Sequence, residues 1–427
     1  MKRLHWLLPG LGLKRWLLMI VLGASAMVVG TLYLLMLAWP ILISNLQGDN
    51  APLSLFTGVT LFLGGALLLF WGIKKGSRAL RTAYHKRRQP DLAAYLRQQR
   101  RAERGPRLVV IGGGTGLATL LRGLKLYSSH LTAIVTVSDE GGSSGRLRRD
   151  MGILPPGDIR NCLLALADTE PVMERLFQHR FQQGSELAGH SFGNLFIAAM
   201  TEMSGDFEQA VHLFSQVLAV RGRVLPATLQ DVRIKAHFAD GTSVTGESLV
   251  AETGKPIAGI ELEPPHPPAL AEAITAILEA EAVIMGPGSL YTSIIPNLLV
   301  EGMVEALRQT EARVIYVCNV MTQPGETRGY SAVDHLQALL WATGPDVIDT
   351  MLMNGEPAPQ ARLMKYTEQG ARPVAPDVKG VRALQVEPVV APLLNETGLI
   401  RHDPDRLAQA LLYLLANHKE RRVGSRL

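Results

Sequence analysis

The feature that most constrains this chain is a pair of strand-like runs that each break into a glycine loop. Residues 107–149 read RLVVIGGGTGLATLLRGLKLYSSHLTAIVTVSDEGGSSGRLRR. Small residues at the point where a strand turns into a helix leave backbone N–H groups uncovered, and such groups bind phosphates. The segment therefore predicts an open α/β sheet and favours a nucleotide or nucleotide-sugar site.

Strands and helices continue to alternate toward the C-terminus. Apolar, β-branched runs predict strands at 107–111, 132–137, 282–285 and 313–318. Helical sequence separates them, which is typical of a mainly parallel sheet. Residues 159–219 have helical spacing, and Asp240-Gly241 between two alternating runs predicts a β-hairpin. We expect one α/β domain at 106–427 with a helical and β-hairpin insertion beside its sheet.

The N-terminal part contains two long uncharged stretches. No charged residue occurs from Trp16 to Gly48 or from Asn50 to Ile73. Each stretch exceeds the roughly 20 apolar residues that a helix needs to cross a bilayer. We expect a transmembrane hairpin of two helices, at 16–44 and 52–73.

Basic residues flank this hairpin, while its connection near 45–52 holds the single acid Asp49. The flanking residues are Lys2, Arg3, Lys14, Arg15, Lys74, Lys75, Arg78, Arg81, Lys86, Arg87 and Arg88. The positive-inside rule then places residues 1–15 and the main domain in the cytoplasm, with the protein multi-pass in the plasma membrane. A signal peptide or a re-entrant loop is the alternative, although the first run is long for a signal peptide and no small-residue cleavage site follows it.

The net charge of +5 and the pI of about 9.2 would suit a nucleic-acid binder, but the basic excess is local. Residues up to Arg104 contain 15 Lys and Arg and 3 Asp and Glu, which leaves 28 basic and 35 acidic residues, a net of −7, in the remainder. We therefore expect no nucleic-acid partner. Residues 74–105 are predicted to be a basic juxtamembrane linker that sets topology, with specific lipid recognition as the alternative.

Only two cysteines, Cys162 and Cys318, occur in the chain. This number argues against a disulfide scaffold and against a cysteine zinc site, and it fits a reducing compartment.

The first glycine loop runs from Gly112 to Gly116. It lacks the third glycine of the dinucleotide fingerprint, because position 117 is Leu, and it lacks the lysine of a Walker loop. It therefore indicates a phosphate or sugar close to the backbone more strongly than it indicates NAD. A tight strand-to-helix turn without a ligand is the alternative.

Acidic residues accompany the second loop. Asp139 and Glu140 precede GGSSGR, and Asp158 opens the segment DIRN with Arg160 and Asn161. An acid at the end of a second strand could bind a ribose hydroxyl or a Mg²⁺ held by phosphates. Asp158 is either a helix N-cap or a ligand, and if it converges with Asp139 a hard-cation site follows.

Two further strands also end in polar loops, GPGSLYTS after 282–285 and CNVMTQPGET after 313–318. Because the carboxyl ends of parallel strands meet at one edge of a sheet, the loops favour a shared ligand site there. Asp403 and Pro404 start a C-terminal helix, and an anion near Arg401 would meet its guanidinium and free N–H groups.

The segment GHSFGNLF places His190 at the start of an apolar helix. A lone histidine there is more often a structural hydrogen-bonding group than a base. No nucleophile elbow of the GxSxG type occurs in the sequence, so acyl transfer is not expected.

The segments GGGTGLATLLRGLK, TVSDEGGSSGRLR, PPGDIRN, GHSFGNL, GPGSLYTSIIPNLL and CNVMTQPGET resemble the YvcK-like gluconeogenesis factor family. The wider superfamily includes the CofD-like 2-phospho-L-lactate transferases of deazaflavin coenzyme synthesis. The resemblance implies a Rossmann-like fold, binding of UDP-sugars such as UDP-N-acetylglucosamine, and control of cell shape, peptidoglycan and gluconeogenic growth. It also implies ligand contacts by Tyr366 and Arg401. The membrane hairpin is not part of the family's usual compact cytosolic pattern.

We expect the ligand-binding residues to come from the four loops and the C-terminal segments. They are Gly113, Gly114, Thr115, Gly116, Asp139, Gly142, Ser143, Ser144, Arg146, Asp158, Asn161, His190, Asn194, Gly286, Gly288, Ser289, Tyr291, Thr292, Asn319, Thr322, Gln323, Glu326, Thr327, Tyr366 and Arg401.

Three functions remain open on the sequence. The first is a membrane-anchored regulator that binds a UDP-sugar, with no catalytic residue and with homo-oligomers or cell-wall-regulating proteins as partners. The second is a transferase of the phospholactyl type, in which Asp139 and Asp158 would hold Mg²⁺ and the glycine loops would neutralise a pyrophosphate. The third is a membrane scaffold without a small-molecule ligand.

Overall fold

The computed structural model describes residues 13–43, 51–84, 98–168, 171–184 and 186–424. They belong to two compact units, Met1–Arg101 and Ala102–Leu427. Most of the predicted 45–52 connection and the basic residues Lys2, Arg3 and Lys86 to Arg88 lie outside the described residues.

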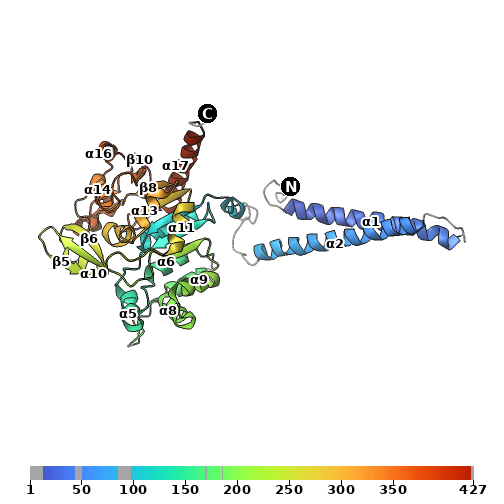
Figure 1. Ribbon diagram of the computed structural model, residues 1–427, viewed down its shortest axis with the longest axis horizontal. Coiled ribbons are helices and arrows are strands. Elements are labelled where there is room, and N and C mark those ends of the chain that lie inside the picture. Colours follow the sequence, from blue (N-terminus) through green and yellow to red (C-terminus); the bar gives the residue numbers. More distant parts are fainter. Residues whose placement is uncertain (1–12, 44–50, 85–97, 169–170, 185, 425–427) are drawn as a thin grey trace. The chain divides into compact units, whose positions relative to one another are not determined.

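The first unit contains two long helices, α1 (Leu13–Ile43) and α2 (Ala51–Tyr84), which lie side by side (Figure 1). They approach closely at two glycines: a Cβ on Gly23 would lie 2.8 Å from the carbonyl oxygen of Gly65, and one on Gly65 would lie 2.7 Å from that of Gly23. Both predicted helices are therefore present. By length and composition, the described part of the chain has one stretch suited to crossing a membrane, Leu18–Met36, with a mean hydropathy of 2.2. That either helix crosses a membrane remains a prediction.

The second unit is built on a seven-stranded sheet in the order β10-β9-β8-β7-β1-β2-β3. All its strand pairs are parallel. Its strands are β1 (Leu108–Gly112), β2 (Leu131–Val135), β3 (Arg223–Pro226), β7 (Ala282–Met285), β8 (Arg313–Val317), β9 (Thr350–Asn354) and β10 (Glu387–Ala391). The mainly parallel α/β fold and all four predicted strands are confirmed.

The order of the strands reverses between β1 and β7. From β1 the chain continues outward through β2 to β3, whereas from β7 it continues the other way through β8 and β9 to β10. The helices after β1 and after β7 therefore cover opposite faces of the sheet, and the loops between strand and helix diverge. Open α/β sheets bind ligands in the crevice that this divergence creates.

Two apolar cores lie on the two faces of the sheet because successive strand side chains point to opposite sides. In β1, Val109 and Ile111 join one core, and Leu108 and Val110 join the other. The core with Leu108 is completed by α4 (Gly114–Leu124), α6 (Gly157–Leu166), α7 (Pro171–Gln178), α8 (Phe192–Ser204), α9 (Phe207–Val217) and α17 (Pro404–Gly424).

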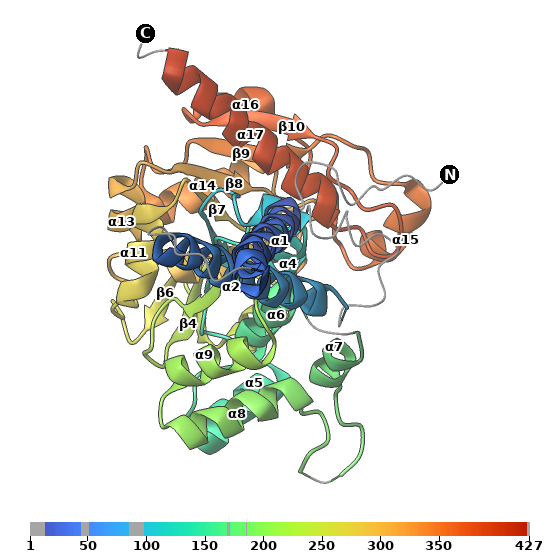
Figure 2. The same ribbon diagram turned by 90° about the vertical axis from the view of Figure 1, so that its right-hand side faces the viewer.

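The core with Val109 is covered by helices from the second half of the chain and by a small sheet. The helices are α10 (Glu247–Thr253), α11 (Ala271–Glu279), the π-helical turn η2 (Leu290–Ile294), α12 (Ile295–Leu298), α13 (Met303–Gln309), α14 (Ala332–Thr343) and α16 (Val378–Ala383). Two further helices are α5 (Gly142–Met151) and α15 (Gln360–Glu368). Figure 2 shows α5, α7, α8 and α9 at one end of this unit and α15, α16 and α17 at the other.

The small sheet has the order β5-β4-β6 and is antiparallel. Its strands are β4 (Arg233–Phe238), β5 (Ser243–Thr245) and β6 (Ile257–Glu263). The β4–β5 pair closes around Asp240 and Gly241, which confirms the predicted hairpin. The helical insertion is also confirmed, since α6, α7, α8 and α9 all lie between Gly157 and Val217. The insertion thus places the hairpin and α10 next to the second glycine loop.

Candidate ligand-binding site

A pocket of about 420 Å³ opens at the carboxyl edge of the main sheet, above the reversal between β1 and β7. It is lined by the loops after β1, β7 and β8 and by two C-terminal segments. Of the predicted ligand-binding residues it brings together Gly113, Gly114, Thr115, Gly116, Gly288, Ser289, Asn319, Thr322, Gln323, Tyr366 and Arg401. A larger cavity, of about 660 Å³ beside α9 and β3, contains none of the predicted residues.

Two glycines of the first loop are required by close packing. A Cβ on Gly113 would lie 2.6 Å from a carboxylate oxygen of Asp158, and one on Gly116 would lie 2.5 Å from the carbonyl oxygen of Pro287. Gly114 has a φ of +66°, which side chains disfavour. Close packing and backbone conformation therefore account for the glycines at positions 113, 114 and 116. The same packing brings the N-terminal turn of α4, with its outward-facing N–H groups, to the pocket.

The loops after β7 and β8 are joined by side-chain amides. Asn319 Nδ2 donates to the Gly288 carbonyl at 2.8 Å, and Gln323 Nε2 donates to Ser289 Oγ at 2.7 Å. The backbone N–H of Gln323 donates to Thr327 Oγ1 at 2.9 Å, and the Thr322 hydroxyl accepts from the backbone of Arg372 at 2.9 Å. These bonds fix one wall of the pocket. Thr327 supports that wall from behind and does not line the pocket.

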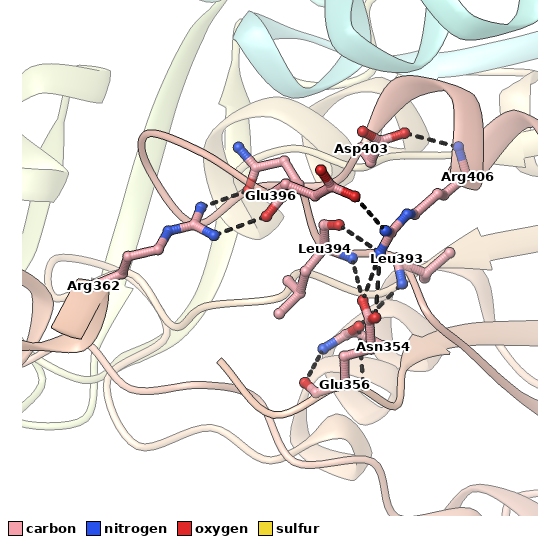
Figure 3. A network of polar contacts seen from close by, with 9 residues as sticks. Asn354, Glu356, Arg362, Leu393, Leu394, Glu396, Asp403 and Arg406 are labelled. Atoms are coloured by element: carbon pink, nitrogen blue, oxygen red, sulfur yellow. Dashed lines mark hydrogen bonds and ion pairs between the residues drawn. The ribbon is translucent and has the colours of Figure 1, made fainter. Parts of the chain in front are cut away.

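Two arginines hold the segment that carries Arg401 (Figure 3). Arg362 of α15 donates to the Asn395 carbonyl at 2.8 Å and to its side-chain oxygen at 2.7 Å. Arg406 of α17 bonds the Glu356 carboxylate at 3.2 Å and the Leu394 carbonyl at 3.1 Å. We name residues 392–403 the C-terminal strap.

Arg401 lies on this strap, and Tyr366 of α15 contacts the strap and also lines the pocket. The Tyr366 hydroxyl accepts from the Ile400 N–H at 2.9 Å, and the Arg401 side chain is exposed. Asp403 accepts the N–H groups of Asp405 and Arg406 at 3.0 and 2.9 Å, so the predicted cap of the last helix is confirmed. The guanidinium of Arg401 is thus free to meet an anion at the mouth of the pocket.

Four carboxyl groups gather behind the first loop: Asp139, Asp158, Glu247 and Glu326. The N-cap interpretation of Asp158 is wrong, because α6 begins at Gly157 and the Asp158 carboxylate accepts the Gly114 N–H at 2.7 Å. Burial, and then the charge of Asp139, raises the pKa of Asp158 to about 6. This electrostatic coupling indicates that Asp139 and Asp158 lie near each other, and a cation site between them remains a prediction.

Glu247, on α10, was not among the predicted residues. Burial, and then the charges of Asp139, Asp158 and Glu326, raises its pKa to about 8. Its carboxyl contacts Thr292, whose hydroxyl also donates to Glu326 at 2.9 Å. Burial likewise raises the pKa of Glu326. No group of three or more His, Cys, Asp or Glu placed to hold a metal ion occurs among the described residues.

The rest of the second loop forms a polar cluster with α6 and α8. Ser143 bonds His190 Nδ1 at 3.0 Å, and Arg160 bonds Asn194 at 2.6 Å and Asn161 at 2.9 Å. His190 is buried, and burial lowers its pKa. These contacts support the structural interpretation of His190.

The remaining predicted residues do not line the pocket. The Tyr291 hydroxyl bonds that of Tyr330 at 2.8 Å, and Arg146 donates to the Ala188 carbonyl at 2.8 Å. Asn194 Nδ2 donates to Ser144 at 3.5 Å. Gly142 and Gly286 take positive φ values of 50° and 78°. Ligand contact by these residues remains a prediction.

Two residues in or next to the pocket were not predicted from the sequence. Glu247 follows a hairpin in the segment TGESL, where an acid is usually solvated. His402 lines the pocket, and its position directly after Arg401 is the one feature of the sequence that points to it.

An open parallel sheet with a polar pocket at its strand-order reversal is typical of the class of α/β proteins that bind ligands at the carboxyl edge. The family profile of 2-phospho-L-lactate transferase CofD matches residues 108–394. The gluconeogenesis factor of Bacillus subtilis is 50% identical over 311 residues, which cover 73% of this chain and 98% of that protein. A relative from Nostoc sp. is 49% identical over 416 residues, 95% of this chain and 91% of its own length.

Solved structures agree with these relationships. The crystal structure of a Bacillus halodurans protein of the UPF0052 family is 47% identical, with a TM-score of 0.70, and covers 72% of this chain and 99% of that one. The chain belongs to the CofD family, among its gluconeogenesis factors.

The raised pKa of Glu247 predicts a pH-dependent effect of Glu247→Gln. The Glu247 carboxyl group binds its proton more tightly in the folded state than in the unfolded state. Protonated Glu247 therefore stabilises the fold below the ordinary carboxyl pKa, and this stabilisation is lost as pH rises through about 8. We expect the variant to be more stable than the wild type at pH 8.5, on the order of 1 to 3 kcal/mol, and equal to it near pH 4.

Urea unfolding of the whole chain, followed by far-UV circular dichroism at both pH values, measures this difference. Glu252→Gln, at an exposed position of the same helix, is the control. A gain in stability that is the same at both pH values would contradict the electrostatic explanation.

Proposed function

We propose that this protein binds a nucleotide sugar of the UDP-N-acetylglucosamine type in the pocket at the carboxyl edge of its sheet. The observation that carries the proposal is the convergence of the first glycine loop, the Gly288–Ser289 turn, Tyr366 and Arg401 around one pocket. The glycine loop and Tyr366 are separated by most of the domain in sequence. The pocket also gives no support to a scaffold without a small-molecule ligand.

The chemistry of the pocket suits a pyrophosphate with a polar sugar. The N-terminal turn of α4 offers backbone N–H groups and a positive helix dipole, and Arg401 offers a guanidinium. Ser289, Thr322 and Asn319 offer hydroxyl and amide groups on the facing wall. With no nucleophile required for binding, the protein would act as a sensor that regulates cell-wall synthesis and gluconeogenic metabolism.

Isothermal titration of the whole chain in detergent with UDP-N-acetylglucosamine tests the proposal. Arg401→Ala removes the guanidinium and should weaken binding about tenfold or more, since a charge-assisted hydrogen bond contributes about 1.5 to 3 kcal/mol. Arg382→Ala, at an exposed position of α16, should bind as the wild type does. If the wild type gives no heat of binding at millimolar ligand, the proposal is contradicted.

We further propose that α1 and α2 anchor this sensor in the plasma membrane with the main domain in the cytoplasm. The apolar stretch Leu18–Met36 supports one span. The Nostoc relative covers 95% of this chain, whereas the Bacillus subtilis relative covers 73%. The match to the Nostoc relative therefore extends into the part of the chain that contains α1 and α2, whereas the match to the Bacillus subtilis relative is shorter. This pattern is expected if an anchor has been added to a common domain.

Cell fractionation tests the anchor. We expect the whole chain in the membrane fraction, resistant to carbonate extraction, and a chain starting at Ala102 in the soluble fraction. A whole chain that is released by carbonate would contradict the anchor but would leave the ligand proposal standing.

A transferase is the second candidate, favoured by the coupling of Asp139 with Asp158 and by the matched profile. Mg²⁺ commonly binds one or two carboxylates together with substrate phosphates, so Asp139 and Asp158 fit it without a third protein ligand. The cation would neutralise the charge that develops on a leaving phosphate. The residues would then hold the metal and orient the acceptor.

Turnover of a nucleotide-activated phospholactate with a deazaflavin acceptor and Mg²⁺ would promote this candidate. Asp139→Asn should then lower the rate at least a hundredfold while nucleotide binding persists. If the wild type itself shows no product by mass spectrometry, the transferase candidate is rejected.

A further inference from the structure

Two arginines from different elements hold one turn of the chain beside the second glycine loop. Arg146 of α5 donates to the Ala188 carbonyl at 2.8 Å, and Arg180, just after α7, donates to the carbonyl of the next residue, Gly189. Figure 2 shows α5 and α7 at the same end of the second unit. The two guanidinium groups are therefore brought to the same turn, although α6 and α7 separate them in the sequence.

A third arginine lies next to this pair. Arg160 of α6 donates to the hydroxyl of Ser191, and Ser191 forms a β-bridge with Arg180. Burial, and then the charge of Arg180, lowers the pKa of Arg160, while the charges of Asp158 and Asp139 oppose this effect. Arg160 and Arg180 therefore repel each other. We name Arg146, Arg160 and Arg180 the arginine cluster.

No carboxylate is paired with the arginine cluster. The hydrogen bonds of its side chains go to carbonyl, hydroxyl and side-chain amide oxygens, and none of the ion pairs in the described part of the chain includes them. Burial, and then the charge of Arg146, lowers the pKa of His190; Arg180 adds to this effect and Asp150 opposes it. A positive potential therefore extends from the cluster.

The arginine cluster borders space that a ligand can enter. Arg180 and Gly142, the first residue of α5, are exposed, and Arg146 is partly exposed. Beyond the backbone of α5 and the adjacent residues, a Cβ on Gly142 would have one neighbour within 4 Å, Arg180 Nη1 at 3.9 Å. A guanidinium has five N–H donors, and Arg146 and Arg180 each use it on one carbonyl. Both therefore keep donors that can bind an anion.

The chemistry of this place suits a phosphate group. Guanidinium groups bind phosphate oxygens through two parallel hydrogen bonds, and they are weakly hydrated. The first turn of α5 has no side-chain cap, so its N–H groups and the helix dipole add to the attraction for an anion. A phosphate monoester carries about two negative charges at neutral pH, which several arginines match better than they match a monoanion.

The arginine cluster is separate from the nucleotide pocket, because none of its residues lines that pocket. Two carboxylates connect the two places. Asp139 accepts the Gly141 N–H, directly before α5, at 2.8 Å, and Asp158 accepts the N–H of Gly114, which lines the pocket, at 2.7 Å. An anion at the arginine cluster would therefore bind on the far side of these carboxylates from the pocket.

We propose that the arginine cluster and the first turn of α5 bind the phosphate group of a second ligand, a small phosphorylated metabolite that is distinct from the nucleotide sugar. The inference goes beyond the proposed function, because binding at this place requires no nucleotide. It also gives a role to the second glycine loop, whose residues do not line the nucleotide pocket.

The experiment is a phosphorus NMR titration of the whole chain, in a phosphorus-free detergent, with inorganic phosphate. The ionic strength is held constant because salt screens exposed charges. We expect saturable broadening of the phosphate signal by the wild type, and displacement by sulfate but not by acetate. Arg180→Gln should weaken phosphate binding about tenfold. Arg180→Lys keeps the charge and should recover part of the affinity.

Matched variants locate the bound phosphate. Arg175→Gln removes one positive charge at an exposed position of α7 and should bind phosphate within twofold of the wild type. Arg401→Ala distinguishes the arginine cluster from the nucleotide pocket, and it should also bind phosphate within twofold of the wild type. Circular dichroism melting of each variant verifies that it is folded.

The inference is overturned if the wild type shows no saturable binding at tens of millimolar phosphate, or if Arg180→Gln binds phosphate as tightly as the wild type does. It is also overturned if Arg175→Gln shows the same loss as Arg180→Gln. A loss in Arg401→Ala that equals or exceeds the loss in Arg180→Gln would place the phosphate in the nucleotide pocket and would likewise overturn it.

The proposed function and this inference fail separately. Titration calorimetry with UDP-N-acetylglucosamine should give Arg180→Gln an affinity within twofold of the wild type. A wild type that binds phosphate through Arg180 but does not bind the nucleotide sugar contradicts the proposed function alone. A wild type that binds the nucleotide sugar but no phosphate at the arginine cluster contradicts this inference alone.

Discussion

The close approach of backbone and carboxylate around the first glycine loop is the constraint on which the rest of the site depends. Gly113 lies against Asp158, and Gly116 lies against the Pro287 carbonyl, with no room for a Cβ at either position. The Asp158 carboxylate also takes the first N–H of α4. This packing fixes the end of β1, the start of α4 and the turn after β7 relative to one another, and these elements form one side of the pocket.

The C-terminal strap completes the pocket from a distant part of the sequence. Arg362 and Arg406 bind its carbonyl groups and carboxylates, and these contacts bring Arg401 and His402 to the same edge of the sheet. Behind the first loop, burial and mutual repulsion raise the pKa values of Asp158 and Glu247. The pocket and this buried carboxyl cluster are therefore next to each other at the carboxyl edge of the sheet.

Much of the fold could be predicted because apolar strands and helical spacing are local signals. The strands β3, β6, β9 and β10 were not predicted: β9 reads TMLMN, with few β-branched residues, and β10 is a partly exposed edge strand. Of the site, the strand-end loops were predictable from their glycines and polar residues. Tyr366 and Arg401 came largely from family resemblance, while Glu247 and the partner of Asp158 depend on tertiary contacts that no local pattern encodes.

The central claim is that the strand-end loops and the C-terminal strap form one binding site for a nucleotide sugar. A crystal structure of the protein grown with UDP-N-acetylglucosamine tests it most directly. We predict density for the ligand with its pyrophosphate between the Gly113–Gly116 loop and Arg401. Ligand density in another cavity, such as the one beside α9 and β3, with this pocket empty, would contradict the claim.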